Sequence, residues 1–156
     1  MKISIVLPAK NESGAIGLTI KKIHQLNFVD EIIVVNDGST DNTLKVAESA
    51  GAIVISHPYS KGNGAAIKTG ARNATGDIIV FMDADGQHDP EDIPRLIEKI
   101  SEGYDLVVGA RQKGSQASLG RGVANALYNN LATYMTEHRV EDLTSGFRVV
   151  RADKFR

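Results

Sequence analysis

Residues 77–90 read Asp-Ile-Ile-Val-Phe-Met-Asp-Ala-Asp-Gly-Gln-His-Asp-Pro, and they carry the clearest local pattern in the chain. The stretch begins as an apolar run between turn residues, which is typical of a buried parallel strand. Asp83, Asp85 and Gln87 follow at alternate positions, and alternate side chains of an extended chain share one face. The stretch therefore predicts two carboxylates and an amide oxygen that converge where a strand leaves its sheet.

Such a cluster has two interpretations. Neighbouring carboxylates repel one another unless one takes a proton or a cation lies between them, and oxygen ligands favour Mg²⁺ or Mn²⁺ with positions left for substrate phosphates. The alternative is a turn that merely happens to be acidic. The position after a buried strand favours a metal–phosphate site, because open α/β sheets bind ligands at the carboxyl ends of their strands.

The composition is that of one soluble globular domain without cysteine chemistry. The chain has 156 residues, 42% hydrophobic and 24% charged, with a formal net charge of −1 and no cysteine. Disulfides and thiolate metal sites are excluded, no overall positive field recruits nucleic acid, and the absence of cysteine fits a cytosolic protein. No apolar run approaches the roughly 18 residues of a bilayer-spanning helix, so we expect any membrane contact to be peripheral or to belong to a segment outside this sequence.

Strands and helices alternate along the first 110 residues. This order predicts an α/β fold with a mainly parallel sheet and helices on both faces. Asp89 is the expected N-cap of the helix that follows the acidic cluster, with Pro90 at its first position. The expected strands cover residues 2–7, 31–35, 52–56, the apolar run from 77, and 105–109; the expected helices cover about 13–26, 42–50, 67–74 and 90–101.

Beyond residue 109 the alternation stops. Residues 112–120 are rich in Gly, Ser and Gln and predict a loop, residues 123–136 predict a helix, and residues 148–150 predict another strand. We expect a single domain over 1–156, with a ligand-binding half over 1–110 and a second part over 111–156 that is truncated at its C-terminus.

Other strand ends add candidates at the same sheet edge. Asp37 closes the second strand beside Gly38, where a carboxylate can accept an N–H from a nucleotide base and glycine permits close backbone approach. The alternative is that Ser39 or Asp41 caps the next helix and Asp37 is solvated. Residues 61–64, Lys-Gly-Asn-Gly, precede a helix and suit a phosphate, the floor of a base or ribose pocket, or an ordinary turn.

Together these residues resemble the family 2 glycosyltransferases with the GT-A fold, in particular the polyprenyl-phosphate sugar transferases of the dolichyl-phosphate mannose synthase type. The family often carries a second Asp where this chain has Asn36. The matching segments lie in the family's order at residues 8–12, 35–41, 61–65, 83–91, 109–111 and 142–148.

The resemblance implies a nucleotide-sugar donor, GDP-mannose or UDP-glucose, and a Mg²⁺ or Mn²⁺ ion on its diphosphate. Asp83, Asp85 and Gln87 would hold the metal, and Asp85 would thereby take part in catalysis. His88, without a second histidine nearby in sequence, is expected to support the cluster structurally. The donor-binding residues would be Pro8, Ala9, Glu12, Asp37, Gly38, Lys61, Gly64, Asp83 and Ala84.

The resemblance also implies an acceptor at the cytoplasmic face of a membrane. Arg111 and Arg121 would clamp a polyprenyl phosphate, with Asn125 near it, and Arg148 would serve donor or acceptor phosphates. A phosphate acceptor is largely ionised near neutrality and needs positioning rather than a general base. For a sugar or protein hydroxyl acceptor, Asp142 is the candidate base. A nucleotide-sugar-binding module without turnover is the third hypothesis.

Overall fold

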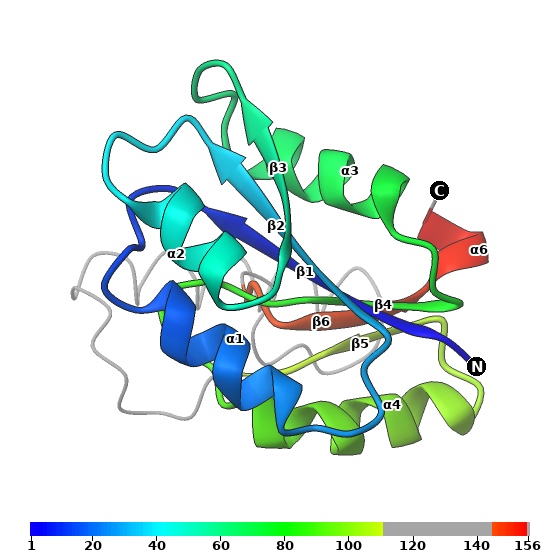
Figure 1. Ribbon diagram of the computed structural model, residues 1–156. Coiled ribbons are helices and arrows are strands. Elements are labelled where there is room, and N and C mark those ends of the chain that lie inside the picture. Colours follow the sequence, from blue (N-terminus) through cyan, green and yellow to red (C-terminus); the bar gives the residue numbers. More distant parts are fainter. Residues whose placement is uncertain (111–144, 156) are drawn as a thin grey trace, which may run out of the picture.

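The computed structural model describes residues 1–110 and 145–155, which form a six-stranded sheet flanked by helices (Figure 1). The strand order is β3-β2-β1-β4-β6-β5. The strands are β1 Ile3–Ala9, β2 Glu31–Asp37, β3 Ile53–His57, β4 Ile78–Phe81, β5 Leu106–Val108 and β6 Arg148–Arg151. The helices are α1 Ile16–His24, α2 Thr43–Ser49, α3 Asn63–Asn73, the 3₁₀ turn η1 Pro90–Asp92, α4 Ile93–Ser101 and α6 Ala152–Phe155.

The sheet is mainly parallel, as predicted. β1 pairs in parallel with β2 and β4, and β2 pairs in parallel with β3. The chain thus builds outward from β1 in one direction and then returns to add β4 on its other side. The carboxyl ends of β1 and β4 meet at this reversal of strand order, which is where open α/β sheets bind ligands.

Both faces of the sheet are buried. On β1, Ile5 and Leu7 belong to a cluster under α1, α2 and α4, whereas Val6 between them belongs to a second cluster under α3 and α6. Figure 1 shows α3 and α6 on one side of the sheet and the other helices on the opposite side. This two-sided burial explains why the strands read as nearly continuous apolar runs.

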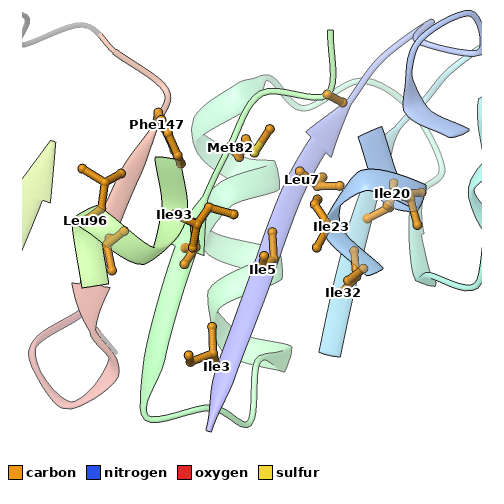
Figure 2. Packing of buried hydrophobic residues seen from close by; sticks show 14 of the residues in the cluster. Ile3, Ile5, Leu7, Ile20, Ile23, Ile32, Met82, Ile93, Leu96 and Phe147 are labelled. Atoms are coloured by element: carbon orange, nitrogen blue, oxygen red, sulfur yellow. The ribbon is translucent and has the colours of Figure 1, made fainter. Parts of the chain in front are cut away.

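The larger cluster fixes the helices through residues at helical spacing. Ile16, Ile20 and Ile23 of α1 are fully buried, and Figure 2 shows Ile20 and Ile23 packed beside β1. On α4, Ile93 packs against the sheet with Leu96 in the same cluster. The apolar residues of each helix thus recur on the face that packs against the sheet.

The acidic stretch is followed by the expected capped helix start. The Asp89 carboxylate accepts a hydrogen bond from the Glu91 N–H at 3.1 Å, with Pro90 at the first position. The first turn is 3₁₀, so the α-helix proper begins at Ile93. α3 begins at Asn63, several residues earlier than predicted, so that Asn63 and Gly64 lie in its first turn.

β6 is the feature that the strand–helix alternation does not predict. It lies between β4 and β5 and pairs antiparallel with both. The strand expected over residues 148–150 is therefore confirmed, but as an insertion into the sheet. The helix predicted over 123–136 lies outside the described residues. Within residues 1–110 and 145–155, no helix is both long and apolar enough to cross a membrane.

Candidate functional site

A cavity of about 360 Å³ opens at the carboxyl ends of β1, β2 and β4. Seven predicted site residues line it: Pro8, Ala9, Glu12, Asp37, Asp83, Ala84 and Asp85. The lining is completed by Lys10, Ser60, Gly62, Asn63 and Ala66. The residues that the sequence places at separate strand ends are thus brought together in one pocket at the reversal of strand order.

Several predicted residues lie elsewhere or are not described. Gly38, Lys61, Gly64 and Gln87 are not among the residues that line the cavity. Arg148 lies in β6, where its Nε donates to the Ser145 carbonyl at 2.8 Å. The remaining predicted site residues lie outside the described part of the chain: Arg111, Arg121, Asn125 and Asp142.

A second cavity of about 530 Å³ lies at the opposite edge of the sheet. It is lined by residues around the start of β4, such as Gly76 and Asp77, and by Arg151 at the end of β6. The parallel strands present their amino ends there. We assign the functional site to the smaller cavity, because the clustered carboxylates and the loops at the carboxyl strand ends lie there.

The acidic cluster forms by a turn rather than by strand alternation. β4 ends at Phe81, and the chain turns at Ala84–Gly86, where Gly86 has a φ of 79°. Asp85 Oδ1 accepts a hydrogen bond from the Gln87 N–H at 3.0 Å. The expectation that these side chains share a face of an extended chain is therefore wrong, although Asp83 and Asp85 both reach the cavity.

Asp83 has a buried histidine, His88, as its neighbour. His88 Nε2 lies 3.3 Å from Asp83 Oδ2, and the His88 ring packs on Phe147 with the ring centroids 5.2 Å apart. His88 itself is buried, at 9% exposure. The geometry agrees with the supporting role expected of this histidine.

Glu12 reports the uncompensated charge of the pocket. Partial burial raises the pKa of its carboxyl, and the negative charges of Asp85, Asp41 and Asp83 raise the pKa further. Repulsion among carboxylates is what a divalent cation removes. In the described ranges no three His, Cys, Asp or Glu side chains form a closed metal site. Asp83 and Asp85 would suffice for Mg²⁺, which is usually bound by one or two carboxylates with substrate phosphates completing its coordination.

Asp37 is buried at 4% exposure. Its Oδ1 lies 2.7 Å from His57 Nδ1 and accepts the Lys61 N–H at 2.8 Å. Its Oδ2 accepts the Ser60 hydroxyl at 2.8 Å and the Gly62 N–H at 2.9 Å. Burial alone would raise the pKa of Asp37, but these four hydrogen bonds outweigh it and hold the pKa well below its usual range.

The helix-cap alternative for this region is right only in part, because the N-cap residue of α2 is Asn42, which makes no side-chain capping bond, and Asp41 precedes it. Asp41 accepts hydrogen bonds from the Thr43 hydroxyl and, at 2.9 Å, from the Thr43 N–H at the start of α2. These bonds lower the pKa of Asp41 to about 2. Asp37, however, is buried and not solvated. Whether a base contacts Asp37 remains a prediction.

Gly38 permits a close approach, but of the chain to itself. With a φ of 67°, it lies so close to the loop after β3 that an added Cβ would be 2.5 Å from the Ser60 backbone nitrogen. Lys61 contributes its backbone N–H to Asp37, while its ammonium lies 5.6 Å from the centre of the Tyr59 ring. The glycine-rich segment therefore shapes the pocket wall through its backbone.

Sequence reasoning missed Lys10 and His57. Lys10 is the basic residue of the cavity lining in the described chain and lies between two predicted residues. His57 ends β3 at the same sheet edge and contacts Asp37. A polar residue directly after an apolar strand was the signal available for His57, because the other strand ends were recognised in that way.

A mainly parallel sheet with an acidic pocket at the reversal of strand order fits a glycosyltransferase of the GT-A class, and the relatives of this chain establish that class. The family model described as "Glycosyl transferase family 2" matches residues 4–156. The chain belongs to this family, which confirms the class predicted from its motifs.

Curated and solved relatives agree with this assignment. The chain is 37% identical, over 96% of its length, to an undecaprenyl-phosphate 4-deoxy-4-formamido-L-arabinose transferase of Proteus mirabilis, and it covers 49% of that protein. The Mycobacterium tuberculosis glucosyl-3-phosphoglycerate synthase, solved with Mn²⁺, UDP-glucose and phosphoglyceric acid, is 32% identical with a TM-score of 0.80; the match covers 97% of this chain and 57% of that one.

A third relative shows the same fold at lower identity. The mannosyl-3-phosphoglycerate synthase of Rubrobacter xylanophilus is 26% identical with a TM-score of 0.83, and the match covers 99% of this chain and 54% of that one. The chain thus spans about half the length of these relatives. What the whole protein transfers, and to which acceptor, is the subject of the proposals below.

Proposed function

We propose that this domain binds a nucleotide-sugar with a divalent cation and transfers its hexose, with inversion, to a polyprenyl phosphate. The observation that carries the proposal is the cavity in which Asp83 and Asp85 face Glu12 at the carboxyl ends of β1 and β4. The divalent cation that accompanies a nucleoside diphosphate would supply the positive charge that such a pocket lacks.

The donor would lie along the pocket from its loop wall to its acidic end. Pro8, Ala9 and the backbone around Gly62 provide the surface for the nucleoside, in GDP-mannose or UDP-glucose, while Asp83 and Asp85 provide oxygen ligands for Mg²⁺ or Mn²⁺. We place Gln87 as a further ligand. The solved relative that holds Mn²⁺ and UDP-glucose supports a divalent cation together with a nucleotide-sugar donor.

Departure of the nucleoside diphosphate is the costly part of the reaction. A bound divalent cation supplies Lewis-acid stabilisation of the departing diphosphate. The chain's own residues fix the geometry: Asp83 is held by His88, and the Asp85 turn is closed by the Gln87 N–H. Lys10 adds a positive charge to the cavity lining.

The curated relative that is named for undecaprenyl phosphate supports a polyprenyl-phosphate acceptor. We propose that Arg111 and Arg121 hold the acceptor phosphate, with Asn125 beside it and Arg148 near the phosphates. An ionised phosphate oxygen attacks without a general base, so that positioning by arginine forks is sufficient. This chemistry would place the protein at the cytoplasmic face of a membrane, in peripheral contact with the lipid.

A second acceptor class is favoured by the solved relatives, which are named for transfer to phosphoglycerate. A hydroxyl acceptor must lose a proton as it attacks, and Asp142 is then the proposed base. A nucleotide-sugar-binding module without turnover is the outcome if neither acceptor reacts.

Transfer assays with the two acceptors separate these proposals. The chain is incubated with Mn²⁺, labelled GDP-mannose or UDP-glucose, and either undecaprenyl phosphate or 3-phosphoglyceric acid. We expect lipid product, with Arg121→Ala losing transfer but not donor binding. Transfer to phosphoglycerate that is abolished by Asp142→Asn would support the second class. Donor binding without transfer to either acceptor would support a nucleotide-sugar-binding module without turnover.

A further inference from the structure

Building on the proposed function, we infer that His57 is a positioning residue for the donor pocket. It acts through Asp37, which anchors the loop Ser60–Gly62 as one wall of the pocket. The Asp37 carboxylate thus serves the donor at least by holding this wall in place.

The Asp37 carboxylate is occupied by hydrogen bonds from within the protein. A carboxylate offers about four acceptor sites on its two oxygens. Four donors already occupy Asp37: His57 and Lys61 on Oδ1, and Ser60 and Gly62 on Oδ2, all within 2.9 Å. Asp37 therefore ties the end of β2 to the end of β3 and to the backbone of residues 60–62.

The orientation of the His57 ring is fixed by its hydrogen-bond partners. The ring is buried at 8% exposure, and its two nitrogens have different partners. Nδ1 faces the Asp37 carboxylate, which only accepts, so Nδ1 carries a proton. Nε2 lies 2.9 Å from the Thr69 hydroxyl of α3. His57 therefore links the end of β3, the end of β2 and the helix that follows the loop.

The loop Ser60–Gly62 depends on the Asp37 carboxylate for its position. The Gly62 backbone has a φ of 92°. The Ser60 backbone lies so close to Gly38 that a residue with a side chain would not fit at position 38. No pairing within the sheet involves residues 60–62. Ser60 and Gly62 line the cavity, so release of the Asp37 bonds would move a wall of the pocket.

The anchor is tested first without any ligand, by amide hydrogen exchange of the chain and its variants. In His57→Ala we expect the Lys61 and Gly62 amides to exchange roughly tenfold or more faster, because their acceptor loses its fixed position. Amides of β1 should be unchanged. Thr69→Val replaces only the hydroxyl that contacts His57 Nε2 and should give a smaller increase in the exchange rate of these amides. It keeps the test informative if His57→Ala fails to fold.

The positioning role is tested by UDP and GDP titration with Mn²⁺ and by donor kinetics. His57→Ala should weaken nucleotide binding roughly tenfold and raise the donor KM, with kcat retained at saturating donor. His57→Asn keeps an N–H donor near the Nδ1 position and should restore most of the affinity. His24→Ala, an exposed histidine on α1, is the matched control and should change nothing.

The outcomes separate this inference from the proposed function. Unchanged Lys61 and Gly62 exchange in His57→Ala would overturn the anchor, whatever the nucleotide does. Faster exchange with unchanged nucleotide affinity would overturn the positioning role. If the unmodified chain binds neither nucleotide, the proposed function and the donor role of His57 fail together, while exchange still decides whether the anchor exists.

Discussion

Gly146 lies directly against Asp83, so that a Cβ added to Gly146 would come within 2.2 Å of Asp83 Oδ2. Gly146 belongs to the turn before β6, where the Ser145 hydroxyl donates to the Gly109 carbonyl at 2.6 Å. The insertion of β6 beside β4 therefore brings a segment from the far end of the chain onto the proposed metal ligand. Only a residue without a side chain leaves the Asp83 carboxylate its position.

Gly146→Ala is expected to displace Asp83 and to weaken Mn²⁺-dependent nucleotide binding. Overpacking at a tight contact costs about 1–3 kcal/mol, so a lower melting temperature should accompany the loss. Titration with nucleotide and Mn²⁺, together with thermal unfolding, measures both effects. Gly14→Ala, at a position with nothing within 4 Å of the added Cβ, is the control. Full metal-dependent affinity in Gly146→Ala would contradict the assignment of Asp83 as a ligand.

Asp85→Asn is expected to lower the pKa of Glu12. Burial and the charge of Asp85 are the two largest causes of the raised Glu12 pKa, so removing that charge should remove part of the shift and leave the part due to burial. NMR titration of the Glu12 carboxyl measures this directly. Asp153→Asn on α6 serves as control and should leave Glu12 unchanged. A Glu12 pKa that does not move would mean that the two side chains do not share the pocket.

The local features of this site were accessible from sequence because each depends on neighbouring residues. Each of these features depends on residues of a single strand or helix: the apolar run before Asp83, the cap at Asp89, and the helical spacing of Ile16 and Ile20. Their meeting at one sheet edge follows from parallel pairing, which the strand–helix alternation predicts.

The remaining features depend on contacts between distant residues. β6 pairs with β4 across about 70 positions of sequence, as in Phe81 with Arg148. The periodicity of apolar residues within a strand does not predict which distant strand it pairs with. The donors of Asp37 come from residues 20–25 positions further on. β4 ends at Phe81 and the chain turns at Ala84–Gly86, so Asp83 and Asp85 reach the cavity as predicted, but through a turn and without Gln87.

Asp37→Asn is expected to destabilise the fold at neutral pH, because an amide cannot accept all four hydrogen bonds. Leaving buried donors unsatisfied costs about 1–3 kcal/mol. Since the folded-state pKa of Asp37 is lowered, its ionised form contributes stability above the unfolded pKa of about 3.9, and that contribution is lost as the pH falls towards the folded-state pKa.

The check is urea unfolding of both proteins between pH 7 and pH 3. The difference in unfolding free energy should be largest at pH 7 and should shrink below about pH 4. Asp92→Asn, at an exposed position in η1, is the control and should stay within about 0.5 kcal/mol. A difference that is constant with pH would contradict the account of Asp37 as an ionised anchor.

The central claim is a metal-dependent nucleotide site at Asp83 and Asp85, and calorimetric titration with UDP and GDP tests it most directly. Each nucleotide is titrated into the chain with Mn²⁺ and again with EDTA. We predict that one of the two binds in the presence of Mn²⁺, that EDTA abolishes the binding, and that Asp85→Asn weakens it at least roughly tenfold. Binding that is equally tight with EDTA, or no binding of either nucleotide, would contradict the claim.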